Sequence, residues 1–494
     1  MNYAKVLCLL AGAMVSSSAF AVETATISKD ELRAAIAELQ ADAEGRTSLL
    51  QGGATAGYDS GGNHKFFVAS SDNKFRLNVS GFAQLRYTFN IRDQDGVPGT
   101  GVGGGGFPDT SYVSNFSMRN IAVRFDGHVV NPNLLYNIRI RTVDGSGLFV
   151  DDAFITYNMN DGLYIKGGQF KSAFSRENLM ADEYVMGADR SIQELFFSSG
   201  RSEGVEFGWK NEAWWVAGTF HDGFNTANSG FLGAGFGTFS GAGAPFVGAA
   251  GATAGIFPLF GQAAYAVGGR VDWTFDGNRE MLADMTSRPG DKSAGALGAA
   301  VEWQQSRHGQ TSTFAPVGAT NTDRDALNFT FDGQWKQSGW SVMGAVNGSV
   351  LMTKNTTALV ADDNQDSVNL GFMLQGAYRF TNESEVFARY DGILLDEDLG
   401  NQAFAPAVGG DNSISNNYYN FITFGYNHYF ADHAAKFTLD CVLSLNQTSP
   451  FVGAENPTLT NIAGGGAAIG GFSGLVGSSK GLEAAVRAQF QIMF

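Results

Sequence analysis

The chain has 494 residues and a formal net charge of −16, and its composition departs from that of a soluble protein. Glycine occurs 65 times and phenylalanine 40 times, whereas charged residues make up only 16% of the sequence, against about a quarter in typical globular domains. The acidic balance argues against nucleic acid as a partner. Near-neutral mean hydropathy with many aromatic residues is typical of a membrane β-barrel, in which only every second residue meets lipid.

The first 21 residues have the features of a cleaved export signal. Lys5 supplies the positive charge, Val6 to Val15 is apolar, and Ala19-Phe20-Ala21 is a small-x-small cleavage site. The apolar stretch is too short to span a bilayer. Cleavage after Ala21 would remove Cys8 and leave Cys441 as a lone cysteine, so we expect no internal disulfide.

Residues 22–64 predict a short periplasmic helix followed by a linker. Ser28 and Glu31 form an S-x-x-E capping box, and apolar residues follow a heptad seam up to Leu50. Such a helix is marginal alone in water, so it would pair with copies of itself as a coiled coil or dock on a periplasmic surface such as the cell wall. A frayed tether is the alternative. Residues 51–63 are Gly-rich and predict a linker.

From Lys65 to Phe494 the hydrophobic pattern has a period of two, which predicts the barrel domain, residues 65–494. Phe75 to Phe89 alternates apolar and polar residues over a length that suits a tilted membrane strand. The chain stops on Phe494, after apolar residues at every second position, so this last segment would be an aggregation hazard as an edge strand in a soluble protein.

Alternating segments predict an all-β, 16-stranded antiparallel transmembrane barrel, and the even number fits bacterial barrels. The first segment begins at Phe75, and the others begin near Asn115, Asn133, Leu148, Gly162, Ser202, Ala213, Gln262, Ala296, Ala326, Gly339, Ser367, Glu383, Asn417, Ala434 and Lys480. Tight joints at 131–133, 160–161, 210–212 and 337–338 suit periplasmic turns, whereas the long Gly-rich stretches 96–114, 222–261 and 447–478 suit exterior loops.

No enzyme, cofactor or metal signature is present. The sequence has no G-x-S-x-G, P-loop or H-E-x-x-H motif, and the six histidines fall in no metal-binding spacing. Gly99-x-Gly101-x-x-Gly104 matches a dinucleotide pattern by spelling only, because no strand precedes it and no helix follows. We therefore expect no enzymatic activity, no cofactor and no bound metal.

Basic residues recur on the polar faces of the early segments, where parity directs them into the barrel. An arginine on the lipid face would cost about 2–4 kcal/mol at mid-membrane, which explains why such residues point inward. Guidance of anions through the lumen and simple lining of a water-filled lumen both remain open. The candidate pore-lining residues are Arg76, Arg86, Arg124, Arg139, Arg141 and Lys166.

The stretch from Lys171 to Arg201, between the fifth and sixth segments, mixes charges of both signs. If it folds inward, it would narrow the pore, and facing charges would set a transverse field across the constriction. An ordinary exterior loop is the alternative. The candidate constriction residues are Lys171, Arg176, Arg190, Arg201, Glu177, Asp182 and Glu183.

Two segments resemble a known family. Gly168-Gln-Phe-Lys-Ser-Ala-Phe-Ser-Arg-Glu177 resembles the G-Q-F-K-x-P-F-S-R-E stretch of phosphate-selective porins of the O and P type, and Phe75 to Gly81 resembles their first strand. The resemblance implies a trimeric 16-stranded porin whose lumen arginines and lysines conduct small anions such as phosphate. Only Lys171 and Arg176 carry over by motif. Ala173 replaces the usual proline, and the second half of the barrel is strongly acidic.

Together these observations predict an exported outer-membrane porin, a homotrimer in the lipid bilayer that lets small hydrophilic solutes, with a possible preference for anions or phosphate, diffuse passively. The competing hypothesis is a structural or adhesive outer-membrane barrel, anchored to the cell wall through residues 28–50.

Overall fold

The structure is a computed structural model, and it describes residues 54–59, 65–92, 112–144, 148–224, 263–306, 322–356, 366–396, 418–446, 474–475 and 482–494. The chain divides into two compact units, Met1–Ala54 and Thr55–Phe494. Apart from Ala54, the description that follows concerns the second unit. The expected export signal and the helix at residues 28–50 lie outside the described residues.

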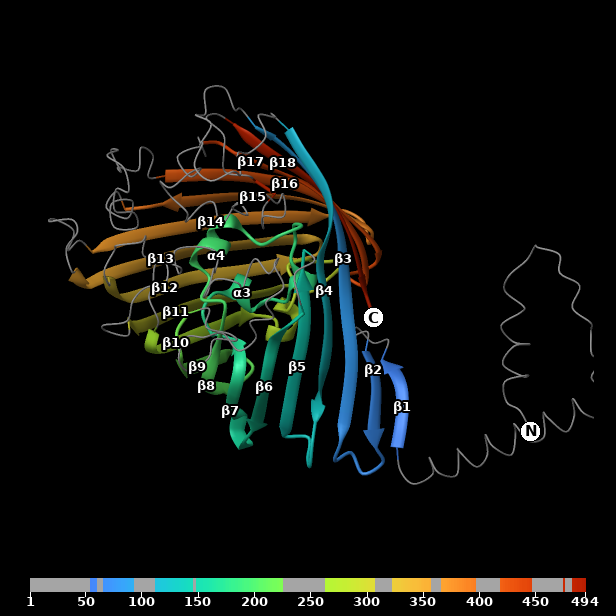
Figure 1. Cartoon of the computed structure of the whole chain (residues 1–494). Coiled ribbons are helices and arrows are strands. Elements are labelled where there is room, and N and C mark those ends of the chain that lie inside the picture. Colours follow the sequence, from blue (N-terminus) through green and yellow to red (C-terminus); the bar gives the residue numbers. More distant parts are fainter. Residues whose placement is uncertain are drawn as a thin grey trace, which may run out of the picture. The chain divides into compact units, whose positions relative to one another are not determined.

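The described part of the second unit is built from strands with a few short helical turns (Figure 1). The strands are β1 (Ala54–Asp59), β2 (Lys65–Ser70), β3 (Arg76–Arg92), β4 (Tyr112–His128), β5 (Leu134–Val143), β6 (Phe149–Asn158), β7 (Leu163–Lys171), β8 (Arg201–Lys210), β9 (Trp214–His221), β10 (Ala263–Asp276), β11 (Ala294–Ser306), β12 (Thr322–Gln337), β13 (Trp340–Thr356), β14 (Ser367–Arg379), β15 (Ser384–Leu394), β16 (Tyr418–Ala431), β17 (Ala435–Ser444) and β18 (Glu483–Met493). The helical turns are η2 (Asn160–Gly162), α3 (Arg176–Leu179), η3 (Asp182–Tyr184), α4 (Ile192–Phe197) and η5 (Arg279–Leu282). No helix in these ranges is long and apolar enough to cross a membrane.

Strands β3 to β18 form a closed antiparallel barrel. Each strand pairs with its neighbours in sequence, and β18 returns to pair with β3, with Met493 opposite Phe82. Phe494 and Gly81 then exchange two backbone hydrogen bonds of 2.8 and 3.0 Å. Closure leaves no open sheet edge, which is the condition for a sheet to survive in hydrocarbon. The predicted 16-stranded antiparallel barrel is therefore confirmed, with strand starts close to those expected.

Strands β1 and β2 precede the barrel, and β1 falls inside the stretch that the sequence analysis assigned to a linker. That part of the linker prediction is wrong. The physical reason lies in β3, which is longer than its closing partner: β18 pairs with Phe82–Arg92 and leaves the start of β3 uncovered. β2 covers this remaining edge, with Phe66 opposite Val79 and Ala69 opposite Arg76, and β1 pairs with β2 in turn.

Side chains alternate between the two sides of the wall, as the period-two pattern predicts. Along β14 the burial alternates almost residue by residue, with Phe372 and Leu374 exposed and Met373 and Gln375 buried. Most exposed positions in the barrel strands are apolar, with exceptions near strand ends such as Ser114, Lys210 and Gln337, and the buried positions include most of the charged and amide side chains. An apolar exterior around a polar interior is the surface expected of a barrel that spans a bilayer.

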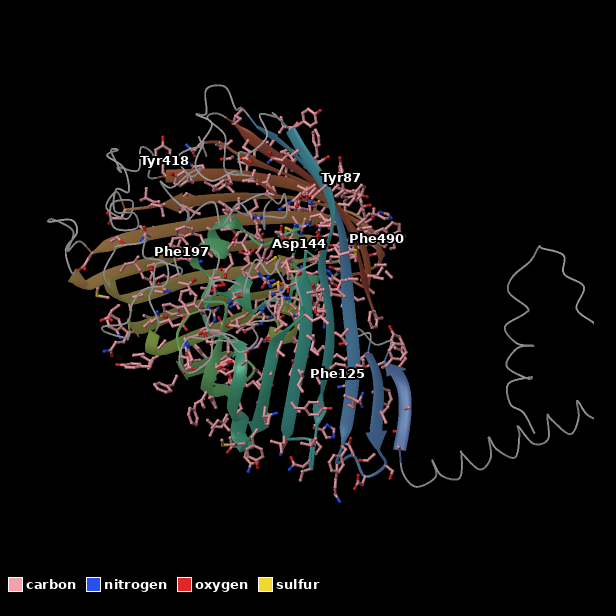
Figure 2. The ribbon with its side chains drawn as sticks, in the orientation of Figure 1. Tyr87, Phe125, Asp144, Phe197, Tyr418 and Phe490 are labelled. Carbon is pink, nitrogen blue, oxygen red and sulfur yellow. The ribbon has the colours of Figure 1, made fainter. Side chains whose placement is uncertain are left out.

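Aromatic side chains gather near the strand ends on this exterior. Where strands meet short turns, Trp214 stacks on Trp273 with ring centroids 6.0 Å apart, and Trp340 stacks on Tyr378 at 4.4 Å. Toward the long-loop end, Tyr87 lies 4.7 Å from Phe116 (Figure 2 labels Tyr87). Such belts of rings are typical of the two interfaces of a membrane barrel.

The two ends of the barrel differ in their connections. At one end most joints are short, apart from the longer connection between β10 and β11, and the four expected tight turns are all present. The turn between β12 and β13 shows why it is tight: Ser338 and Gly339 both have positive φ, 42° and 90°, as a two-residue hairpin turn requires. Both described termini of the barrel, at β3 and β18, lie at this short-turn end.

We expect the two faces of β5 to respond oppositely to charge. Ile138 is exposed on the outer face in mid-strand, so Ile138→Arg should lower the free energy of unfolding in lipid vesicles by about 2–4 kcal/mol. Asn137, its neighbour, lies on the inner face opposite Asp126, so Asn137→Arg gains an acidic partner and should be tolerated. Denaturant unfolding in vesicles measures both, and equal losses for the two variants would contradict the assignment of faces.

Candidate functional site

Residues 172–200, here called the inner loop, connect β7 to β8 and lie inside the barrel. Figure 1 shows α3 and α4, which belong to this loop, surrounded by strands. Nearly all its side chains are buried, and its groups bond to the wall on many sides. The strands that contribute a bonding partner are β3, β4, β5, β10, β11, β12, β13, β15, β16, β17 and β18. The loop thus crosses the lumen and does not project from the barrel.

The two short helices of the inner loop cap each other. Ser175, the N-cap of α3, accepts a hydrogen bond from Asn178 N and donates one of 2.6 Å to Glu194 in α4. Ser191, the N-cap of α4, accepts from Glu194 N and donates one of 2.5 Å to Glu177 in α3. Helices this short are not stable alone. The crossed caps therefore make α3 and α4 a single unit.

Asp189 forms the first charged node between the inner loop and the wall. Its carboxylate pairs with Arg86 at 2.6 Å, with Arg487 at 3.1 Å and with Arg119 at 3.3 Å, on three adjacent strands around the barrel seam. Burial alone would raise the pKa of Asp189, but the three guanidinium groups outweigh it and hold that pKa below its usual value. Asp189 is therefore ionised and neutralises part of the arginine cluster.

Asp182 of the inner loop forms a second charged node, with arginines of β5. It accepts from Arg139 at 3.1 Å and Arg141 at 3.0 Å, and it also pairs with Arg190 of the loop itself. Burial opposes ionisation of Asp182, but Arg190, Arg141 and Arg139 lower its pKa well below the usual range. Glu183 lies beside it, 3.7 Å from Arg139.

Arg176 forms a third node on the far side of the lumen. Its guanidinium contacts Asp272 at 2.7 Å and Asp332 at 3.2 Å, and Arg270 bridges the same two carboxylates at 2.7 Å each. Ser172 donates a hydrogen bond of 2.5 Å to Glu302 nearby. The inner loop is thus tied to opposite walls by groups of both signs.

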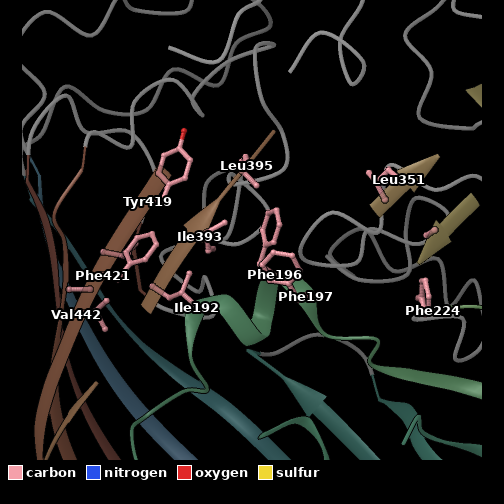
Figure 3. Close-up of a cluster of buried hydrophobic side chains, with 13 residues drawn as sticks. Ile192, Phe196, Phe197, Phe224, Leu351, Ile393, Leu395, Tyr419, Phe421 and Val442 are labelled. Carbon is pink, nitrogen blue, oxygen red and sulfur yellow. The ribbon is translucent and has the colours of Figure 1, made fainter. Parts of the chain in front are cut away.

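Apolar packing fixes the inner loop against the β12–β17 wall. Figure 3 shows Ile192, Phe196 and Phe197 of α4 in a buried cluster with Ile393 and Tyr419 of the wall. A second cluster is rich in methionine, and its members are Met180, Val185, Met186, Met285, Met343, Ala345, Met373, Ala377 and Phe387. Methionine adapts to irregular gaps, which suits a loop packed on a curved wall.

The connection between β10 and β11 also folds inward, from the short-turn end. Met285 N donates to Tyr184 O of the inner loop at 3.3 Å, and Met285 joins the methionine cluster. Lys336 holds this connection through Asp284 at 2.5 Å. Segments from both ends of the barrel therefore meet inside it.

The packing leaves the lumen asymmetric. Inward side chains on β13 to β18, such as Asn347, Gln375, Thr423 and Arg487, are buried. Several inward side chains on β4 to β9 keep part of their surface exposed, namely Arg124, Arg141, Phe154, Lys166 and Trp215. Other inward side chains on these strands, such as Arg139 and Glu206, are buried, so the exposure in the described residues is confined to part of the β4–β9 wall.

All six candidate pore-lining residues lie on the inner face, but most are paired with acids. Arg86, Arg139 and Arg141 belong to the nodes above, Lys166 pairs with Glu206 at 2.9 Å, and Arg124 lies 3.9 Å from Glu183. Arg76 lies at the short-turn end, hydrogen-bonded to Asn78. The candidate constriction residues meet in the inner loop and its stems: Lys171 donates to Asn178 O and Met180 O, and Arg201 pairs with Asp152 at 2.7 Å.

The sequence analysis missed the partners on the wall. Arg119, Arg270, Asp272, Asp332, Asp440 and Arg487 all take part in the buried network. Most of these residues alternate with apolar neighbours on the polar face of their strands, and this pattern could have placed them inside the barrel. Within the described ranges, no group of three or more His, Cys, Asp or Glu side chains is arranged to hold a metal ion.

No protein-family model and no curated protein sequence matches the chain. Among solved structures, an anion-selective porin from Comamonas acidovorans has 9% sequence identity and a TM-score of 0.47, with 85% of this chain and 99% of that chain covered. OprB of Pseudomonas putida has 9% identity and a TM-score of 0.47, over 91% and 96% of the two chains. The channel DcaP of Acinetobacter baumannii has 11% identity and a TM-score of 0.46, over 84% and 97%. Likenesses this distant carry no argument about family or solute, and the resemblance to phosphate-selective porins stays a prediction.

Removing the Asp189 carboxylate should destabilise the inner loop. Asp189→Asn would leave three buried guanidinium groups short of one negative charge, so we expect a loss of about 3 kcal/mol or more in the free energy of unfolding. Asp161→Asn in the exposed turn between β6 and β7 is the matched control, because Asn tolerates its positive φ of 59°. Denaturant unfolding should separate the two, and similar losses for both would exclude the node as an anchor.

Stability should also depend on the protonation of Glu194. Burial, reinforced by Glu177, raises the pKa of Glu194 to about 8, although Ser175 opposes the shift. Because this folded-state pKa lies above the unfolded value of 4.5, the stabilisation is complete below 4.5 and is lost as pH rises through about 8. Glu194→Gln should flatten this dependence, whereas Glu212→Gln in an exposed turn should not. Unfolding midpoints measured from below pH 4.5 to above pH 8 test it, and an unchanged slope in Glu194→Gln would refute the assignment.

Proposed function

We propose that the protein is an outer-membrane porin through which small hydrophilic solutes diffuse passively. The observation that carries the proposal is the asymmetry of the barrel interior. The inner loop packs on the β12–β17 wall, while charged side chains on β4 to β9 stay in contact with water. The space between the inner loop and the β4–β9 wall is then the path of the solute.

The charges along this path support a preference for anions. Lys166 has 17% of its side-chain surface exposed, against 1% for its partner Glu206, and Arg141 has 18%, against 2% for Asp151. The Arg119–Asp144 pair has the opposite order. In the first two pairs the cation stands between the water and its acid, so a solute meets the positive group first. The sequence resemblance adds phosphate to the anions to be tested.

The location and assembly follow from the same proposal. An export signal at residues 1–21, an apolar exterior and aromatic belts at both ends fit insertion in the outer membrane. A homotrimer is the assembly that the sequence resemblance implies. Cross-linking of the protein in its native membrane tests the trimer independently of conduction.

Single-channel recording in a planar bilayer tests conduction and ion preference together. We expect open-channel current. In a KCl gradient, we expect the reversal potential to have the sign of a channel that is more permeable to chloride than to potassium. Replacing Lys166 and Arg141 by Gln should reduce the anion-to-cation permeability ratio roughly twofold or more, because charged side chains along a pore set its selectivity. Lys292→Gln, exposed at the short-turn end, is the matched control.

The outcomes separate the two parts of the proposal. Folded protein that never conducts would end the porin assignment. A cation-selective current would end the anion preference alone and leave passive diffusion in place.

A further inference from the structure

We propose that the β5–β9 wall carries a lengthwise track of paired aromatic rings and cations that binds flat organic anions, such as aromatic carboxylates, as they pass. The inference rests on the proposed porin function and names the class of solute that its path favours. The track is defined by four cations that make five cation–ring contacts, described below from the long-loop end to the short-turn end.

The track begins where β6 begins, at the long-loop end. The Arg141 guanidinium lies 5.4 Å from the centroid of the Phe149 ring, and these two residues face each other across the β5–β6 pair. In mid-strand, the Lys166 ammonium lies 4.2 Å from the Phe170 centroid and 5.7 Å from that of Phe154. An attractive cation–ring contact needs about 6 Å or less, so each pair qualifies.

The track continues to the short-turn end on β7 and β9. The Lys210 ammonium lies 5.8 Å from the Tyr164 centroid, and the Arg279 guanidinium lies 5.6 Å from that of Trp215. Trp215 Nε1 donates a hydrogen bond of 2.8 Å to the Tyr164 hydroxyl, which joins these two rings. The pairs therefore follow the full height of the wall that borders the water-accessible lumen.

A glycine makes room for the track. A Cβ at Gly208 would lie 2.1 Å from Cζ of Tyr164, so any other residue there would push the ring off the wall. The Tyr164 hydroxyl also donates to Glu206 at 2.7 Å, which fixes the ring along β8. The ring is thus held along the wall beside the path and is not free to swing across it.

The chemistry of the exposed groups selects the solute. The Phe149, Phe154 and Trp215 rings are only partly buried, and so is Lys166. A bare inorganic anion would use the cations and leave the rings unused, whereas an uncharged apolar solute would use only the rings. A flat ring that carries a carboxylate can stack on an aromatic side chain and approach a neighbouring cation at the same time.

The test is block of the ionic current of the folded channel by 2-naphthoate, added in solution to a planar bilayer. Acetate supplies the same charge without a ring, and 2-naphthylmethylammonium supplies the ring with the opposite charge. We expect 2-naphthoate to block at a lower concentration than either control. In the double variant Phe154→Leu, Trp215→Leu, its half-blocking concentration should rise about fivefold or more, because leucine keeps apolar volume but loses the stacking face.

Two further variants keep the result interpretable. Phe220→Leu removes a ring from the outer face of β9, so its block should match the parent protein. Trp215→Phe keeps a ring and should retain most of the block. Conduction with equal block by 2-naphthoate and acetate, or with block unaffected by the double variant, would overturn the track alone. Absence of conduction in all variants would overturn both the track and the porin function.

Discussion

The inner loop depends on the pairing of buried charges across the lumen. A carboxylate or guanidinium that loses water on entering a packed interior must find an opposite charge there, and an unmatched one is strongly destabilising. Asp189 and Asp182 supply negative charge to arginines on β3, β4, β5 and β18, while Arg176 supplies positive charge to Asp272 and Asp332 on the opposite wall. The loop carries charges of both signs because one wall presents buried arginines to it and the other presents buried aspartates.

The packing of the inner loop and this division of charge explain which inward side chains of the barrel remain exposed. Burial of apolar surface is favourable, so the apolar groups of α4 and the methionine cluster pack the inner loop against β12–β17. On the β4–β9 wall the loop forms ion pairs with arginines of β4 and β5, and Arg124, Arg141 and Lys166 of this wall keep part of their surface exposed. In the Lys166–Glu206 and Arg141–Asp151 pairs the long side chain of the cation reaches past a buried acid, so the cation is the more exposed member even though the chain as a whole is acidic.

Much of the fold could be predicted from the sequence because it follows from local patterns. Parity along Phe75–Phe89 and at the C-terminal segment reports which face meets lipid, and tight joints such as 337–338 mark the turns, so all sixteen barrel strands were anticipated. The length and mixed charges of 171–201 indicated a loop with an unusual position. Strand β1 was missed because it pairs with β2, which covers the part of the long β3 edge that β18 leaves open, and this arrangement depends on strand lengths known only after closure.

Parity assigns a side chain to the inside of a barrel but does not name its partner. Arg86 and Arg139 were placed in the lumen correctly, yet as candidates for free anion-guiding groups, whereas each pairs with a loop carboxylate. Arg487 and Asp189 are 298 residues apart in the chain, and only the curvature of the barrel brings them to 3.1 Å. Under the proposed function, selectivity depends less on the number of arginines than on which member of each pair is nearer the water. The inner loop takes part in only one of the Lys166–Glu206 and Arg141–Asp151 pairs, because Asp182 contacts Arg141, whereas Lys166 and Glu206 face each other through the register of β7 and β8.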